Sequence, residues 1–375
     1  MSGIYVHIPF CTKACHYCDF HFSTNLSNKS TFTNTICEEI KLRKKDFKGA
    51  FNSIYFGGGT PSILTLTEIE KIMNQLFVYV DSSQIQEVTI EVNPEDISVD
   101  LLRGYQKLGI NRLSIGVQSL DDKILSWMNR NHSSKKAITA INQAKELGIE
   151  NISVDFIYGV PNFPKRNISN ELHQLLNNSP FHISCYHFTI EEKTYFGWLN
   201  KQEKLAELND LKSEKEFKLI TQTLEQKGYD HYEVSNFSLS GKASKHNTNY
   251  WKKQQYVGLG PSAHSYTYPI RKWNISNNAA YIKQLQQGKL DQEKEKLSKI
   301  DHFNELIMLG LRTKEGVNIE EALLLIEANQ QDKIKLKIQE FIEDKFLAKE
   351  GPIISLRKEK WLLSEYVSRE LFILN

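Results

Sequence analysis

The stretch Ile8-Pro-Phe-Cys-Thr-Lys-Ala-Cys-His-Tyr-Cys-Asp-Phe20 follows an apolar, strand-like run and brings three cysteines close together in the sequence. Four cysteine thiolates usually hold an iron–sulfur cluster, so a group of three predicts a 4Fe-4S cluster with one iron open to another ligand. A structural zinc site is the alternative, with His16 or His21 as its fourth ligand. Zinc sites generally pair such a motif with a second two-ligand half, which does not follow here, so the cluster is the favoured interpretation. The spacing is C-x3-C-x2-C, formed by Cys11, Cys15 and Cys18.

The composition of the chain is that of an ordinary globular protein. It has 375 residues, of which 40% are hydrophobic and 25% charged, and its formal net charge is +2. This balance lacks the basic surplus of nucleic-acid-binding proteins, and no run approaches the roughly 18 apolar residues of a membrane span. The strand-like start leaves no room for a signal peptide, and five cysteines in a chain of this length do not suggest a disulfide framework. We therefore expect a cytoplasmic protein that does not bind nucleic acid.

Short runs rich in Val and Ile alternate with amphipathic helical patterns over the first 230 residues. The strand-like runs are residues 3–10, 53–56, 87–92, 112–117, 152–158 and 183–190. The helical patterns are residues 31–45, 66–80, 99–108, 135–147, 170–176 and 203–227. This alternation is typical of right-handed β/α units with a parallel sheet. Six units predict an α/β fold with a partial (β/α)6 barrel.

The candidate site residues lie where these strands end. Cys11 follows the first strand, Gly57-Gly-Gly-Thr-Pro61 follows the second, and Glu91 and Gln118 end the third and fourth. Asp155 lies within the fifth strand, close to its end. Because active sites of such barrels lie at the carboxyl ends of the strands, we expect these residues to share one rim.

The rest of the chain has a different character. We expect a partial barrel over residues 1–230, an irregular connecting region over 231–300, and a mainly helical, winged-helix-like domain over 301–375. In that last domain, residues 317–347 carry seven acidic side chains against four lysines, a net charge of −3. This charge opposes contact with a phosphate backbone, so the domain is interpreted as a lid or docking piece.

The segment His246-Asn-Thr-Asn-Tyr-Trp251 is a second unusual cluster. Histidine is a common haem ligand, and Tyr250 and Trp251 add flat apolar surface beside it. The alternative is a structural histidine that holds an irregular segment in place. His246 is therefore a haem candidate with two interpretations, and His264 has the same two.

Together these residues resemble the radical S-adenosylmethionine (SAM) superfamily, through the cysteine motif, the glycine loop and the six-unit organisation. In that superfamily SAM chelates the open iron, so the resemblance implies a 4Fe-4S cluster and SAM as cofactors. It also implies a set of SAM-contacting residues at the matching positions. These are Tyr5, Tyr17, Gly58, Gly59, Thr60, Glu91, Gln118, Arg130 and Asp155, with Thr189 and His264 in the same shell.

Four motifs narrow the resemblance to the group that contains the oxygen-independent coproporphyrinogen III oxidase and the haem chaperone HemW. They are Tyr5-Val-His-Ile-Pro-Phe-Cys11, Phe56-Gly-Gly-Gly-Thr-Pro-Ser62, Ile115-Gly-Val-Gln-Ser119 and His246–Trp251. Two departures separate the chain from the oxidase: Phe20 stands where the oxidase carries a further cysteine, and only ten residues precede the first cysteine of the motif.

The resemblance to the haem chaperone implies haem as cargo and its delivery to haem proteins of the respiratory chain. A homodimer and a peripheral membrane contact are compatible with that role. The alternative is a radical SAM enzyme, above all the oxidase, and the residues leave open whether SAM is cleaved.

Overall fold

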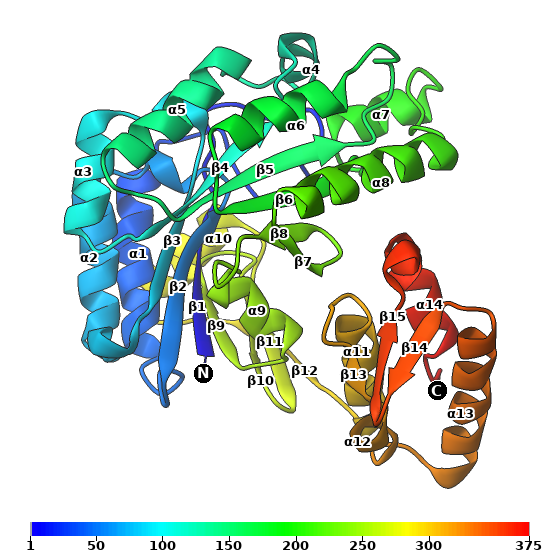
Figure 1. The fold of residues 1–375 in the computed structure, drawn as a ribbon. Helices are drawn as coiled ribbons and strands as arrows, with labels where there is room; N and C mark the ends of the chain where they lie inside the picture. Colours follow the sequence, from blue (N-terminus) through cyan, green and yellow to red (C-terminus); the bar gives the residue numbers. More distant parts are fainter. Residues whose placement is uncertain (1, 375) are drawn as a thin grey trace.

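The computed structural model describes residues 2–374, and its main body is a curved parallel sheet with helices on its outer face (Figure 1). The six strands that open the chain pair in sequence order, each parallel to the next. They are β1 (Ser2–Ile8), β2 (Phe51–Gly58), β3 (Glu87–Val92), β4 (Arg112–Gln118), β5 (Ile152–Tyr158) and β6 (His182–His187). The expected α/β fold with a partial (β/α)6 barrel is confirmed.

The helices of the barrel follow the strands, and those after α1 (Lys29–Leu42) begin with a side-chain cap. Before α2 (Leu66–Phe77), for example, the Thr65 hydroxyl accepts a hydrogen bond from Glu68 N at 3.2 Å, and Glu68 Oε2 accepts one from Thr65 N at 2.8 Å. The helices are α1 (Lys29–Leu42), α2 (Leu66–Phe77), α3 (Val99–Lys107), α4 (Asp122–Trp127), α5 (Ser134–Glu146), α6 (Ile168–Asn177), α7 (Tyr195–Lys201) and α8 (Asp210–Gln226). No helix within residues 2–374 is long and apolar enough to cross a bilayer.

The predicted helix over 203–227 is too long at its start. Residues 205–209 are not helical, and α8 begins only at Asp210. The Asn209 side chain accepts a hydrogen bond from Leu211 N at 3.1 Å and so caps the helix there. The start of α8 could not be predicted because charged residues occur both before and after it. A charged helix and a charged loop have similar composition.

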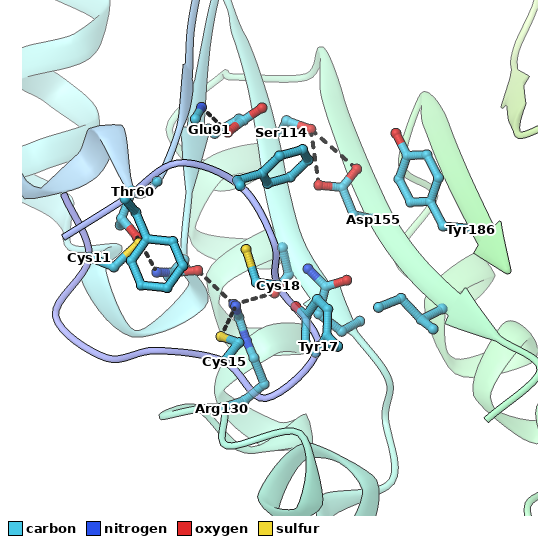
Figure 2. A pocket seen from close by; sticks show the side chains of 18 of the residues that line it. Cys11, Cys15, Tyr17, Cys18, Thr60, Glu91, Ser114, Arg130, Asp155 and Tyr186 are labelled. Atoms are coloured by element: carbon cyan, nitrogen blue, oxygen red, sulfur yellow. Dashed lines mark hydrogen bonds between the residues drawn. The ribbon is translucent and has the colours of Figure 1, made fainter. Parts of the chain in front are cut away.

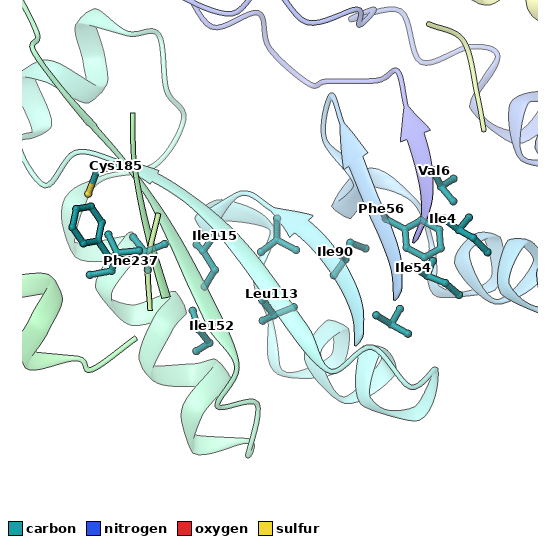
Figure 3. Packing of buried hydrophobic residues seen from close by; sticks show 14 of the residues in the cluster. Ile4, Val6, Ile54, Phe56, Ile90, Leu113, Ile115, Ile152, Cys185 and Phe237 are labelled. Carbon is teal, nitrogen blue, oxygen red and sulfur yellow. The ribbon is translucent and has the colours of Figure 1, made fainter. Parts of the chain in front are cut away.

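Alternate side chains of each strand face the helices and form the core. Leu113, Ile115 and Val117 of β4 are fully buried there, and each such side chain stabilises the fold by about 1.5–3 kcal/mol. Figure 3 shows this layer across the sheet, with Ile4, Val6, Ile54, Phe56, Ile90, Ile152 and Phe237 among its members. The alternate positions of β4 are Arg112, Ser114, Gly116 and Gln118, which face the inside of the barrel and line a cavity. A polar inner face thus leaves the centre of the barrel unfilled.

The segment over 231–300, expected to be irregular, is largely regular and extends the sheet at both edges. Its strands are short and pair at sites far away in sequence: β9 runs parallel to β1, while β8 runs antiparallel to β6. The elements are β7 (Asp230–Glu233), β8 (Asn236–Ser238), α9 (Lys245–Trp251), β9 (Tyr256–Leu259), β10 (His264–Thr267), β11 (Ile270–Asn274), α10 (Asn278–Gln286) and β12 (Gln292–Lys296). The full sheet has the order β12-β11-β10-β9-β1-β2-β3-β4-β5-β6-β8-β7. The expectation failed because β12, Gln-Glu-Lys-Glu-Lys, has no apolar residue and owes its form to pairing with β11.

The C-terminal part is mainly helical, as expected, and lies beside the β7 edge of the sheet (Figure 1). Three helices precede a hairpin, which is the order of a winged-helix module. The elements are α11 (Lys299–Gly310), β13 (Val317–Asn318), α12 (Ile319–Leu323), α13 (Ala328–Glu343), β14 (Leu347–Glu350), β15 (Ile353–Leu356) and α14 (Ser364–Glu370). Backbone hydrogen bonds join it to the barrel, from Val234 N to Arg312 O at 3.0 Å and from Lys314 N to Tyr232 O at 3.1 Å.

Candidate functional site

A cavity of about 460 Å³ opens at the carboxyl ends of the barrel strands, the rim where such folds place their sites (Figure 2). Its wall includes the loop after β1, the glycine loop after β2 and the inner face of β3 to β6. The structure brings most of the predicted site residues together here. These are Cys11, Cys15, Tyr17, Cys18, Gly58, Gly59, Thr60, Glu91, Gln118, Arg130, Asp155 and Thr189.

The three cysteines lie on the loop after β1, which backbone hydrogen bonds hold against the rim. Cys11 N donates to Ser23 O at 3.1 Å, and His16 N donates to Met128 O at 3.1 Å. Burial and the neighbouring thiols raise the pKa of Cys11 to about 11 and that of Cys18 to about 12. The thiols are therefore close enough to sense one another's charge, and a metal centre would have to displace their protons.

Polar neighbours of the thiols suit a thiolate-bound metal centre. Arg130 Nη1 donates to Cys15 Sγ at 3.4 Å, and the Thr60 hydroxyl donates to Cys11 Sγ at 3.4 Å. Within residues 2–374, no three His, Cys, Asp or Glu side chains are placed to share a single metal ion. A cluster binds each thiolate through a different iron and does not need that convergence. The donor set therefore fits an iron–sulfur cluster.

Arg130 is fixed by a residue that follows β3 and by a residue within β4. Its Nη2 donates to Asn93 Oδ1 at 2.6 Å and to Gly116 O at 2.9 Å, while its Nε is buried without a hydrogen-bond partner. Asn93 is not among the residues predicted from the sequence, although it follows the end of β3 just as other site residues follow their strands. Position relative to the strand end was the signal that could have found it.

Two carboxyl groups, Glu91 of β3 and Asp155 of β5, lie inside the cavity (Figure 2). Glu91 accepts hydrogen bonds from the Tyr55 hydroxyl at 2.8 Å and from Gly58 N at 3.1 Å, and Asp155 accepts from the Ser114 hydroxyl at 3.4 Å. Burial raises the pKa of Glu91 to about 8 and that of Asp155 to about 6. Glu91 is therefore mostly protonated at neutral pH, and a cation bound beside it would favour its ionised form.

Strained backbone marks the rim as well. Gln118 has a φ of 64° and Gly58 a φ of 111°. For a residue other than glycine this left-handed conformation costs about 1–3 kcal/mol and is concentrated at ligand sites. A Cβ on Gly59 would lie 2.6 Å from Phe10 O, so only glycine lets the two loops approach this closely.

Two predicted residues lie elsewhere. The Tyr5 hydroxyl bonds to His7 Nδ1 at 3.1 Å, and its ring stacks on Tyr55 with centroids 6.1 Å apart. His264 is exposed and stacks on Trp273 at 5.6 Å. In the part of the chain that the structure describes, neither side chain lines the cavity. Tyr5 lies in the middle of β1, below the rim, and the position of β10 could not be deduced from its sequence.

His246 lies in α9 and is buried, with 2% of its surface exposed. Its Nδ1 bonds to the Ser53 hydroxyl at 3.0 Å, and its Nε2 bonds to the Tyr250 hydroxyl at 3.1 Å. Its backbone N–H donates to Glu87 Oε1 at 3.0 Å. Burial lowers the pKa of its imidazole to about 3. In this conformation His246 has no free nitrogen for iron, so the geometry supports the structural interpretation over the haem candidate. Trp251 lies apart from the cavity, with the Arg312 guanidinium 5.6 Å from its ring centre.

The fold and the rim site together define a protein of the radical SAM class, and comparisons with known proteins agree. The family model for the radical SAM superfamily matches residues 5–175, and that for the HemN C-terminal domain matches residues 297–363. The chain is 32% identical over 322 residues to the heme chaperone HemW of Bacillus subtilis (strain 168), and the match covers 85% of each chain. It is 31% identical to HemW of Lactococcus lactis subsp. lactis (strain IL1403), over 92% of this chain and 90% of that one. The chain belongs to the HemW heme chaperone family.

A solved structure extends the likeness over the whole fold. Coproporphyrinogen III oxidase (HemN) from Escherichia coli, a radical SAM enzyme, superposes with a TM-score of 0.81 over 98% of this chain and 89% of its own. Its sequence identity is 21%, so this match concerns the fold and not the activity.

Proposed function

We propose that this protein is a haem chaperone that holds a 4Fe-4S cluster and SAM, binds haem and delivers it to haem proteins of the respiratory chain. The relationship to HemW over nearly the whole chain carries the proposal, because those relatives are named as heme chaperones. The cavity supports it, since three cysteines with a basic neighbour line the rim where this fold places its site.

In this proposal Cys11, Cys15 and Cys18 bind the cluster. When bound, the cluster would offer an open iron to SAM and, once reduced, an electron. Arg130 stabilises the thiolate of Cys15 through its hydrogen bond, and Thr60 does the same for Cys11. Both contacts favour the deprotonated sulfur that metal binding requires.

SAM would occupy the remainder of the rim. Glu91 offers carboxylate oxygens to its ammonium group, and the Gly58–Gly59 loop offers close backbone contacts. Asp155 and Gln118 provide polar groups for its ribose hydroxyls. The remaining residues of this proposed set that line the cavity are Tyr17, Thr60, Arg130 and Thr189.

The proposal also assigns roles to the parts of the chain. Residues 1–230 form the cofactor-binding barrel, residues 231–300 connect it, and residues 301–375 act as a lid or docking piece. We place the protein in the cytoplasm, with a homodimer and a peripheral membrane contact as further features to test.

The proposal is tested by anaerobic reconstitution with iron and sulfide, followed by haem titration with and without SAM. Saturable haem binding that survives gel filtration, and transfer of that haem to an apo-haem protein, are the expected results. A reconstituted protein that binds no haem would refute the chaperone function.

The same preparation separates the chaperone from the enzyme alternative. Incubation with SAM, a reductant and coproporphyrinogen III should yield no decarboxylated porphyrin. Product formation coupled to release of 5′-deoxyadenosine would instead identify an oxidase.

A further inference from the structure

The floor of the cavity contains a buried cation without hydrogen-bond partners. Arg112 begins β4, is 2% exposed and lines the cavity. Its Nε is fully buried without a partner, and no described residue accepts a hydrogen bond from its guanidinium. A buried guanidinium that makes none of its five possible hydrogen bonds is costly, so a ligand or water must meet it.

The nearest anion does not satisfy this group. Glu87 Oε2 lies 4.0 Å from Arg112 Nε, beyond hydrogen-bond reach. The Glu87 carboxylate already accepts hydrogen bonds at the start of α9, from Ser244 Oγ, Lys245 N and His246 N at 3.0–3.3 Å. Glu87 therefore balances part of the charge of Arg112 but leaves its donors free.

Small side chains keep the space in front of Arg112 open. Barrel interiors are usually filled by bulky branched residues, but here Ser114, Ser153 and Ser184 occupy neighbouring inner positions of β4, β5 and β6. Two carboxyl groups border this layer, Asp155 of β5 and Glu91, which lies opposite Ser114 on β3. Burial raises the pKa of Asp155 to about 6 and that of Glu91 to about 8. A ligand at the floor would meet one guanidinium, serine hydroxyls and carboxyl groups that can share a proton with it.

Arg130 is less available than Arg112 for a two-pronged contact. Its Nη1 and Nη2 are already bonded to Cys15, Asn93 and Gly116. The Nη donors of Arg112 have no acceptor among the described residues, and its planar guanidinium has the fork geometry that matches a carboxylate.

We propose that Arg112 and the serines beside it form a carboxylate-binding subsite at the floor of the cavity. The inference rests on the proposed function for the identity of the ligand. Haem carries propionate carboxylates, whereas in that proposal the amino-acid end of SAM lies at the rim, on the open iron.

A matched pair of ligands tests the subsite. Binding of haem, haem dimethyl ester and SAM is measured for the reconstituted wild-type protein and for Arg112→Gln. The substitution should weaken haem binding about 10- to 100-fold and leave the binding of haem dimethyl ester and of SAM unchanged. Unchanged haem affinity in Arg112→Gln would overturn the subsite.

Controls keep the result interpretable. Arg103→Gln removes an exposed arginine on α3 and should change no affinity. Arg112→Lys retains the charge without the fork and should lose affinity to an intermediate degree; iron content and thermal stability show whether each variant is folded. An equal loss of affinity for haem and for haem dimethyl ester in Arg112→Gln would overturn the subsite while leaving the chaperone function intact. A wild-type protein that binds no haem would overturn both.

Discussion

The rim cavity can be compared with the α9 network, which is the set of hydrogen bonds made by His246 and Glu87. Both are buried polar regions of one barrel, but they differ in how many of their polar groups have hydrogen-bond partners. In the network, both ring nitrogens of His246 and the carboxylate of Glu87 have partners. In the cavity, the Nε atoms of Arg112 and Arg130 are buried without a partner. Buried polar groups in native proteins are normally satisfied, and Arg112 is the cation that the proposed carboxylate subsite would satisfy through its Nη donors. The presence or absence of hydrogen-bond partners thus distinguishes the structural His246 from the residues of the candidate site, although unusual sequence motifs contribute to both.

The largest effect is expected for a cysteine of the rim cavity. Cys15→Ala should abolish the cluster, because it removes one of the three thiolates that bind iron. Iron and sulfide analysis and the visible absorption after anaerobic reconstitution measure this. Cys37→Ala, which removes a buried cysteine of α1, is the control and should keep full iron content. A full four-iron complement in Cys15→Ala would refute the cluster assignment.

The next effect concerns Glu91. Glu91→Ala should weaken SAM binding about 10- to 100-fold without loss of iron, because it removes a buried acceptor of charge-assisted hydrogen bonds. Calorimetric titration of the reconstituted protein measures the affinity. Unchanged affinity would exclude Glu91 from the SAM site.

The same residue predicts a pH dependence of stability. The pKa of Glu91 is raised from 4.5 to about 8, so the folded protein retains a proton that the unfolded chain loses above about pH 4.5. The free energy of unfolding should therefore fall as the pH rises from about 4.5 to 8, and Glu91→Gln should reduce this fall. Denaturant unfolding of the metal-free protein at several pH values tests the sign. An identical pH profile for the variant would contradict the raised pKa.

On the network side, the expected effect is on stability. His246→Ala removes two buried hydrogen bonds and should lower the free energy of unfolding by about 2–4 kcal/mol, with the haem spectrum unchanged. Thermal unfolding and absorption of the haem complex are the two readouts. A changed haem spectrum in a stably folded variant would show that α9 rearranges to free His246 for iron.

The smallest effect should come from an exposed pair between the barrel edge and the C-terminal domain. Lys314 Nζ lies 2.9 Å from Asp230 Oδ1, and both side chains are at least half exposed. Lys314→Met should change stability by at most about 1 kcal/mol, because solvent screens exposed ion pairs. A larger loss would mean that this pair, and not the backbone bonds at Tyr232 and Val234, holds the domain in place.

The barrel and most of the site were predictable because both depend on local patterns. Apolar alternation marked β1 to β6, and the cavity residues follow those strands at their carboxyl ends, where parallel topology brings them together. The strands after residue 230 were not predictable, since β12 has no apolar pattern and depends on its partner β11. Arg112 was not predicted as a site residue because it lies at the start of a strand, away from the carboxyl end. Only its alternation with Leu113 indicated that it faces the inside of the barrel.

The sequence by itself determined the fold class, the family and the three cysteines, because these depend on residue type, spacing and periodicity along the chain. Tertiary structure decided which polar groups have partners. His246 and Arg112 are both buried, but one lies against Ser53 and Tyr250 while the other lies against a hollow lined by serines. That distinction arises because strands far apart in sequence meet inside the barrel. A local sequence pattern does not show whether a buried charged group will find a hydrogen-bond partner on a distant segment.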